Sequence, residues 1–207
     1  MFAFKAGEYQ PSASQPPSNA RRFCSAPRPW SADRVFVYLR TGFDRDHAAA
    51  AGPMGPVTYN TARAPMADVR AMAIYIGSLM PKAGAGTPPA DRAARAALAH
   101  PEGAVLYAGA CANCHDAGAP MMLEGRPALE LGTPLHLDDP RDVIQIILQG
   151  LNPPTGPAGP AMPAYADSLT DHQVAEITAY LRSRFSDRAP WRNLPAAVAR
   201  ARKEGSA

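Results

Sequence analysis

The 207-residue chain contains only three cysteines, and aromatic residues make up only 7% of it. Three cysteines are too few for a dense disulfide framework. No apolar run reaches the roughly 20 residues that a bilayer-spanning helix needs, so the sequence predicts no membrane span. The net charge is +3, and no block of Lys or Arg concentrates it on one segment. The charge pattern therefore predicts no nucleic-acid partner.

Segments with the period-two alternation of half-buried strands are also lacking, which predicts an all-α fold. The 23 prolines and 16 glycines indicate short helices separated by loops. Residues 1–29 are rich in Pro, Ser, Ala and Gln, and we expect them to be irregular. Helical periodicity and terminal signals predict helices over these segments: 31–42, 67–81, 101–115, 138–150 and 168–185.

Residues that start or stop helices support three of these predictions. Ser31 is a candidate N-cap, and Gly42 follows the last turn of the same segment. Thr170 and Gln173 have the spacing of a capping box at the start of the last predicted helix. Gly150 stops the helix before it. These signals place the helix ends to within a few residues.

Two stretches, residues 30–81 and 138–186, resemble each other in order, spacing and chemistry. In each, a helix ends in glycine, and a methionine follows twelve residues later. The methionine lies in a stretch rich in proline and glycine that we expect to be a loop, which in the first copy includes residues 52–57. The helices after the loops coincide too: Val69, Met72, Tyr75 and Ile76 lie over Val174, Ile177, Tyr180 and Leu181. Such a repeat implies two copies of one unit. The first copy has no counterpart of residues 101–115, so we expect half a domain there.

Residues 111–115 read Cys-Ala-Asn-Cys-His. Cys-x-x-Cys-His is the attachment signature of c-type haem. Two thiols about one helical turn apart can reach the two vinyl groups on one side of a porphyrin. The next histidine then directs its imidazole at the iron from the same face. We therefore interpret Cys111 and Cys114 as covalent haem anchors and His115 as the proximal iron ligand.

Three other interpretations of this motif compete with the haem clamp. A zinc site needs four ligands, usually in two spaced pairs, and only His136 or His172 could be recruited to complete one. A thioredoxin-like redox pair is typical of a strand followed by a helix, whereas these cysteines end a predicted helix. Coincidence is the third alternative. The residues around the motif argue against it.

A low-spin electron carrier needs a second axial ligand, and a methionine thioether is a common choice. Met162 lies in the loop before the last helix, with prolines on both sides that restrict the backbone. We therefore expect Met162 to be the distal iron ligand. Met121 and Met122 lack such a frame, and we interpret them as gap-fillers in a core.

The stretch around the motif, residues 101–186, resembles a class I cytochrome c domain. The resemblance rests on Gly103 and Tyr107 before the cysteines, on Met162, and on Tyr180 in the C-terminal helix. It implies that the first and last helices cross at a contact between small and aromatic residues near the haem. In this family a proline carbonyl steadies the proximal histidine. Pro127, twelve residues after His115, is the matching candidate.

Residues 28–202 are similar, more loosely, to the multihaem cytochrome c subunits of bacterial membrane-bound dehydrogenases, which serve alcohol, aldehyde and N-heterocycle dehydrogenases. The resemblance implies that the partners are a dehydrogenase catalytic subunit and a downstream electron acceptor. It also implies a periplasmic location, at the inner membrane through a complex. The resulting division of the chain is an irregular segment 1–29, an incomplete half-domain 30–82, a linker 83–100, a cytochrome c domain 101–187 and a tail 188–207.

The expected function is single-electron transfer by one covalent haem c rather than catalysis, because His115 and Met162 would leave the iron no open position. The alternatives are a haem-free interaction module from a truncated gene and a peroxidase-like haem enzyme. The half-domain has a methionine, Met54, but no clamp, and Cys24 does not supply one. No export signal is visible. We therefore expect that the chain is the C-terminal part of a longer subunit, in which Met54 binds nothing and Cys24 is an unpaired thiol.

Overall fold

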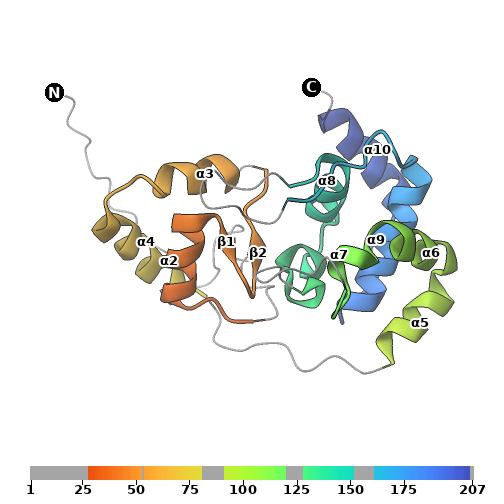
Figure 1. The fold of residues 1–207 in the computed structure, drawn as a ribbon, viewed down its shortest axis with the longest axis horizontal. Coiled ribbons are helices and arrows are strands. Elements are labelled where there is room, and N and C mark those ends of the chain that lie inside the picture. The colour runs from red at the N-terminus through yellow and green to blue at the C-terminus, as the bar shows by residue number, and fades with distance from the viewer. Residues whose placement is uncertain (1–27, 53, 81–90, 120–127, 152–160, 206–207) are drawn as a thin grey trace.

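The computed structural model describes residues 28–52, 54–80, 91–119, 128–151 and 161–205. Two groups of helices, each with its own hydrophobic core, make up the fold (Figure 1). The N-terminal group contains α2 (Ala32–Thr41), β1 (Phe43–Asp44), β2 (Ala48–Ala49), α3 (Met54–Thr61) and α4 (Met66–Ser78). The C-terminal group contains α5 (Arg92–Ala99), α6 (Pro101–Ala110), α7 (Ala112–His115), α8 (Arg141–Gln149), α9 (Asp171–Phe185) and α10 (Leu194–Gly205), with 3-10 helices over Leu129–Leu131 and Thr133–His136.

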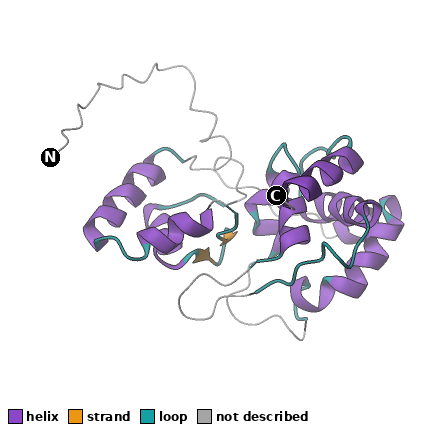
Figure 2. Cartoon of the chain, turned by 90° about the horizontal axis from the view of Figure 1, so that it is seen from above, coloured by secondary structure: helices purple, strands orange, loops and turns teal. Residues whose placement is uncertain are grey.

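Helices dominate the described part of the chain, which confirms the predicted all-α class (Figure 2). The exception is a small antiparallel pair, in which Phe43 of β1 lies opposite Ala49 of β2. These strands could not be predicted, because two residues are too few to establish an alternating pattern.

Local hydrogen bonds explain where the helices begin and end. The Ser31 side chain accepts a hydrogen bond from the backbone N–H of Arg34 at 3.2 Å, and Gly42 ends α2 with φ +73°. Thr170 and Gln173 form the reciprocal capping box at the start of α9. These predicted helix ends are confirmed. Each relies on contacts within four residues, which is why the sequence alone could indicate them.

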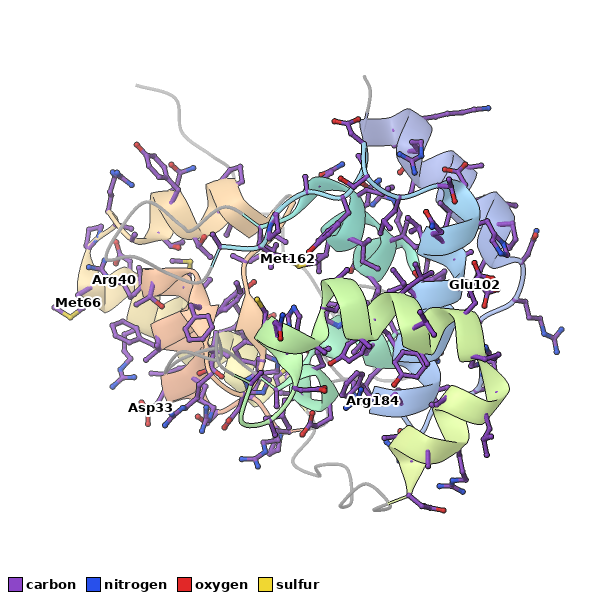
Figure 3. All side chains as sticks on the ribbon, turned by 45° about the vertical axis from the view of Figure 1, so that its right-hand side comes forward. Asp33, Arg40, Met66, Glu102, Met162 and Arg184 are labelled. Atoms are coloured by element: carbon purple, nitrogen blue, oxygen red, sulfur yellow. The ribbon has the colours of Figure 1, made fainter. Side chains whose placement is uncertain are left out.

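The N-terminal group is built on the packing of α2 against α4. Its core contains Val35 and Leu39 from α2, Val69 and Ala73 from α4, and Trp30 just before α2. The two helices approach closely at Gly77, where an added Cβ would lie 3.0 Å from the backbone nitrogen of Ala32. The Arg40 guanidinium of α2, labelled in Figure 3, donates to the carbonyls of Thr61 and Ala64, which fixes the end of α3.

Helix α3 corrects one prediction, because residues 52–57 were expected to form a loop. The helix instead begins at Met54, inside that segment. Pro56 lies in its first turn, where backbone N–H groups have no partner within the helix, so the proline costs no hydrogen bond. The first-turn position also suits the fixed φ of proline. A glycine-proline pattern therefore did not exclude a helix here.

The C-terminal group is built around α9, which packs against α5, α6, α8 and α10. Its core contains Tyr107 of α6, Ile144 and Ile147 of α8, and Ile177 and Tyr180 of α9. Arg182 of α9 is 4% exposed, and its guanidinium donates to the carbonyls of Leu135, Leu137 and Ala189. These bonds satisfy a buried charge and fix the segment after α9 against the second 3-10 helix.

Two helices that the sequence placed outside the cytochrome c domain share this core. Residues 83–100 were assigned to a linker, yet α5 lies within them and its Ala96 is fully buried in the C-terminal core. Residues 188–207 were assigned to a tail, yet Ala197, Val198 and Ala201 of α10 are buried there as well. The side chains involved are small, so the sequence showed no strong apolar stripe. The expected boundaries at residues 101 and 187 therefore omit part of the core.

Among the residues that the structure describes, no helix combines the length and apolar character that a bilayer crossing requires.

Candidate functional site

The Cys-x-x-Cys-His residues lie in a tight turn at the end of α6. The helix stops at Ala110, and Cys111 takes a non-helical conformation before α7 begins. The carbonyl of Cys111 accepts hydrogen bonds from the backbone N–H groups of Cys114, at 3.1 Å, and His115, at 3.0 Å. The two thiols and the imidazole therefore project from a single short turn, rather than from the continuous helix that we expected over 101–115.

Cys111 and Cys114 are both free thiols and both half-buried. Burial, with a smaller contribution from the neighbouring Cys114, raises the pKa of the Cys111 thiol to about 11. The Cys111 thiol is therefore protonated at pH 7. A protonated, half-buried thiol is a weaker nucleophile than the thiolate on which a redox pair depends.

The histidines that could complete a zinc site have other partners. Nε2 of the buried His136 lies 2.9 Å from the carbonyl of Glu130, and its Nδ1 lies 3.2 Å from the Ser186 hydroxyl. Burial lowers the pKa of His136. His172 is at the surface, where Nε2 lies 3.1 Å from a Glu102 carboxylate oxygen. Within the described ranges, no three His, Cys, Asp or Glu side chains gather as a metal site.

Met162 is held against the end of α8 by its backbone. Its N–H donates to the carbonyl of Leu151, and the N–H of Leu151 donates to the carbonyl of Met162, both at 2.9 Å. Gly150 makes this approach possible, because a Cβ there would lie 2.3 Å from the Met162 carbonyl oxygen and because its φ is +70°. Figure 3 labels Met162 on this segment. The backbone of Met162 is therefore fixed by tertiary hydrogen bonds to Leu151.

Tyr165 connects the methionine segment to the cysteine turn. Its hydroxyl donates to the carbonyl of Ala110, the residue before Cys111, at 2.9 Å. Its backbone N–H donates to the carbonyl of Ile147 in α8 at 3.1 Å. The structure thus brings the backbone next to Cys111 and the backbone next to Met162 together through one side chain. Sequence reasoning missed Tyr165, although an aromatic residue three positions after the methionine was a usable signal.

A polar network holds the residue that follows His115. The Tyr107 hydroxyl donates to the Asp116 carboxylate at 2.7 Å, and the Arg184 guanidinium of α9 pairs with the same oxygen at 2.7 Å. Figure 3 labels Arg184 on α9. Arg184 also donates to the Tyr180 hydroxyl at 3.1 Å. Burial, and then the hydrogen bond to Asp116, raise the pKa of Tyr107. The turn that carries His115 is thereby tied to α6 and to α9 at once.

The predicted helix crossing is present, and its geometry explains the glycine. A Cβ on Gly103 would lie 2.3 Å from the carbonyl oxygen of Glu176 and 2.8 Å from Cβ of Tyr180. The rings of Tyr107 and Tyr180 lie 5.3 Å apart, centroid to centroid, in a tilted arrangement. Only glycine lets α6 approach α9 closely enough for this ring contact. Sequence reasoning named Tyr107 and Tyr180 but missed Asp116 and Arg184, which join them to the turn.

Four residues discussed from the sequence lie outside the described residues: Cys24, Met121, Met122 and Pro127. The expected support of His115 by Pro127 therefore stays a prediction. Met54 begins α3 in the N-terminal group, and its carbonyl accepts a hydrogen bond from Thr58. In the part of the chain that is described, Cys111 and Cys114 are the only cysteines.

The donors at this site fit a haem c in kind and in order. The two thiols and the imidazole leave one turn, and the thioether comes from a separate, firmly held segment. Thiol, imidazole and thioether groups are the ligands and anchors that c-type haem uses. Cys111 and Tyr165 pack against the C-terminal core, so the lining is partly apolar. An apolar lining of this kind suits a porphyrin face.

Comparison with known proteins also finds similarity to cytochromes. Residues 98–181 match the family model described as cytochrome C oxidase, cbb3-type, subunit III. A nicotinate dehydrogenase subunit of Pseudomonas putida is 38% identical over 178 residues, which cover 84% of this chain and 15% of that protein. The fructose dehydrogenase cytochrome subunit of Gluconobacter japonicus is 32% identical, over 76% of this chain and 37% of that protein.

The cytochrome c subunit of alcohol dehydrogenase (quinone) from Gluconacetobacter polyoxogenes is 29% identical over 192 residues, which cover 86% of this chain and 40% of that protein. The chain thus spans between 15% and 40% of the length of these three relatives. The alignments with all three extend well beyond residues 98–181, so the similarity also includes part of the N-terminal group.

Proposed function

We propose that the chain transfers single electrons through one covalent haem c, because residues 98–181 match the family model described as cytochrome C oxidase, cbb3-type, subunit III. Cys111 and Cys114 would form the thioether bonds, His115 would be the proximal iron ligand, and Met162 would be the distal ligand. The observation that carries the proposal is the connection of the cysteine turn to the methionine segment through Tyr165.

When bound, haem c supplies an iron that accepts one electron from a donor and passes one electron to an acceptor. The chain's own residues would hold and shield it. His115 and Met162 would both bind the iron, which would leave no place there for a substrate or for peroxide. Tyr107 and Arg184 would keep the turn in place through Asp116. Because these side chains are already held by hydrogen bonds, they would rearrange little when the bound haem gains or loses an electron.

The names of the relatives support a proposal about partners. They are subunits of dehydrogenases for nicotinate, fructose and alcohol. We therefore propose that a dehydrogenase catalytic subunit supplies the electrons, that a respiratory-chain acceptor takes them, and that transfer occurs on the periplasmic side of the inner membrane. The described surface carries both signs of charge in separate ion pairs, such as Arg202–Asp171 and Arg141–Glu204. A small transient docking interface is sufficient for such transfer.

The decisive experiment is a count of covalent haems. The protein would be produced with an added export signal in a host that attaches c-type haem, and a pyridine haemochrome spectrum would be combined with intact mass. We expect one haem per chain, lost when Cys111 and Cys114 are both replaced by serine. Two haems would contradict the single-site proposal. A haem-free product in that host would reject it altogether and favour the interaction-module alternative.

The axial ligands are tested by substitution. Met162→Ala should leave the haem attached but open the iron to exogenous imidazole, which is visible in the absorption spectrum. Met66→Ala is the matched control, because Met66 is 65% exposed on α4 and lies in the other group. His115→Ala should reduce the yield of attached haem. Unchanged ligand binding in Met162→Ala would remove Met162 from the site.

A further inference from the structure

A cleft of about 490 Å³ lies on the C-terminal group, between the start of α8 and the segment that follows α9. An opening of this size is typical of sites that bind small molecules. Three of its four charged lining residues are arginines, namely Arg182, Arg188 and Arg192, and the fourth is Asp138. Neither the cysteine turn nor the Met162 segment lines it. The cleft therefore presents a net positive charge away from the residues proposed to hold haem.

Arg182 is the buried arginine of the cleft, with only 4% of its surface exposed. Its Nε donates to the carbonyl of Ala189, and its Nη1 donates to the carbonyls of Leu135 and Leu137. These bonds use every hydrogen on Nε and Nη1. Among the residues that the structure describes, none accepts a hydrogen bond from Nη2. Nη2 is therefore the part of the guanidinium that can bind a ligand.

The charge of Arg182 also has no direct counter-ion. The three carbonyls are neutral, and no carboxylate in the described ranges forms an ion pair with Arg182. Burial, and then the positive charge of Arg188, lower the pKa of Arg182, and the negative charges of Asp138 and Asp187 only partly offset this. A buried cation without a paired charge is costly. An anion that entered the cleft would reduce this cost.

An aromatic wall lies beside this charge. Cζ of Arg182 lies 4.3 Å from the centroid of the Trp191 ring. The indole N–H donates to the carbonyl of Leu137 at 2.9 Å, which holds the ring in place. Pro140 and Pro190 add further apolar surface to the lining. A flat apolar group can pack on these rings while a charged end of the same molecule contacts Arg182.

We propose that this cleft binds a small aromatic carboxylate. The carboxylate would accept hydrogen bonds from Nη2 of Arg182, and the charges of Arg188 and Arg192 would attract it. The aromatic ring would pack on Trp191. An inorganic anion would leave the apolar part of the lining without contacts, so the lining favours an organic ligand. The proposal goes beyond electron transfer and does not depend on haem.

Isothermal titration calorimetry on the haem-loaded full chain tests this proposal, with benzoate as the probe. Acetate carries the same charge without the ring, and benzyl alcohol carries the ring without the charge. We expect one benzoate per chain, bound about fivefold more tightly than acetate because of the aromatic contact. Benzyl alcohol should show no measurable binding. This order would show that the charge and the aromatic wall both contribute.

Arg188→Gln removes one charge from the cleft at an exposed position, so the variant should remain folded. It should weaken benzoate binding about threefold to fivefold, which is the effect of one solvent-exposed charge pair. Arg63→Gln is the matched control, because Arg63 is also exposed but lies in the N-terminal group. It should leave benzoate binding unchanged. Unaltered circular dichroism would show that both variants are folded.

Three outcomes would overturn the proposal. The first is an absence of benzoate binding. The second is inorganic phosphate or acetate binding as tightly as benzoate, because the cleft would then only attract anions in general. The third is benzoate binding that Arg188→Gln does not weaken, or that Arg63→Gln weakens equally. Each of these failures would leave the haem count and the axial-ligand tests unaffected, because none of the proposed haem ligands lines the cleft.

Discussion

In α4 and α9 the same pattern of apolar residues meets two different environments. Val69 and Val174 are fully buried in both groups, but Tyr75 is 65% exposed and Tyr180 is 4% exposed. The difference arises from α6, which packs on α9 and has no counterpart on α4 among the described residues. The comparison shows that helical periodicity indicates a face able to be buried. Whether it is buried depends on a helix from elsewhere in the chain.

The two groups also differ in what stabilises them beyond the shared face. The C-terminal group adds apolar contacts from α5, α6 and α10. The N-terminal group contains a buried polar cluster, in which Asp44 lies 2.7 Å from His47 Nδ1 and 3.2 Å from Arg34, and the Trp30 ring stacks on His47 with centroids 3.6 Å apart. The buried polar contacts of the N-terminal group therefore lie next to its apolar core, at Trp30.

Substitution of Tyr75 and Tyr180 should give the largest difference between the two groups. Tyr180→Ala should destabilise the C-terminal group by about 3–5 kcal/mol, because it removes a buried ring. Tyr75→Ala should change the stability of the N-terminal group by less than about 0.5 kcal/mol, because its ring is exposed. Hydrogen exchange with mass spectrometry reports the opening of α4 and α9 separately. Equal losses at the two sites would contradict the difference in burial.

The close approach of α6 to α9 gives the next largest effect. Gly103→Ala should cost about 3 kcal/mol, because its Cβ cannot fit 2.3 Å from the Glu176 carbonyl oxygen and the helices must separate. Gly109→Ala in the same helix is the control, because a Cβ there meets nothing within 4 Å. It should stabilise α6 by up to about 1 kcal/mol. Urea denaturation of the two variants measures both; a neutral Gly103→Ala would disprove the tight crossing.

The shared face should respond equally in the two groups. Val69→Ala and Val174→Ala each remove two buried methyl groups from a fully covered position. We expect each to destabilise its own group by about 2 kcal/mol. The same exchange measurement, read at α4 for one variant and at α9 for the other, checks this. A much smaller loss at Val69 would mean that the N-terminal core packs less well than its burial indicates.

The smallest effect concerns pH and the N-terminal group alone. Burial would raise the pKa of Asp44, but hydrogen bonds from His47 and the Asp46 N–H, with the charges of His47 and Arg34, lower it overall. A lowered folded-state pKa stabilises the group above the unfolded value of about 4, and this contribution is lost as pH falls through the folded value.

Asp44→Asn should therefore cost about 1.5 kcal/mol at pH 7 and should make the stability of the group less sensitive to acid. Thermal unfolding between pH 3 and 7, followed by exchange in α2 and α4, compares the variant with the natural chain. Asp33→Asn is the control, since Asp33 forms an exposed pair with Arg70 at 2.6 Å. An unchanged acid response in Asp44→Asn would assign the pH sensitivity to another group.

Much of the fold could be predicted because its signals are local. The ends of α2 and the start of α9 depend on contacts within one or two turns, made by Ser31, Gly42 and the Thr170–Gln173 capping box. Residues so close in the sequence can be recognised as caps without the tertiary structure. The start of α3 at Met54 was missed, because the prolines and glycines around it are equally compatible with a loop. The break of α6 at Cys111 was also missed, since the Cys-Ala-Asn-Cys-His motif contains no proline or glycine that would indicate it.

The candidate site divides in the same way. The sequence by itself determined the cysteine-histidine motif, the methionine before the last helix and the internal repeat, because each is a matter of residue type and spacing. Only the tertiary structure decided that Tyr165 joins the two halves of the site, that Ala96 and Val198 belong to its core, and that Tyr75 is exposed. The physical reason is that burial and long-range hydrogen bonds depend on segments far apart in the chain, whose approach no local pattern specifies.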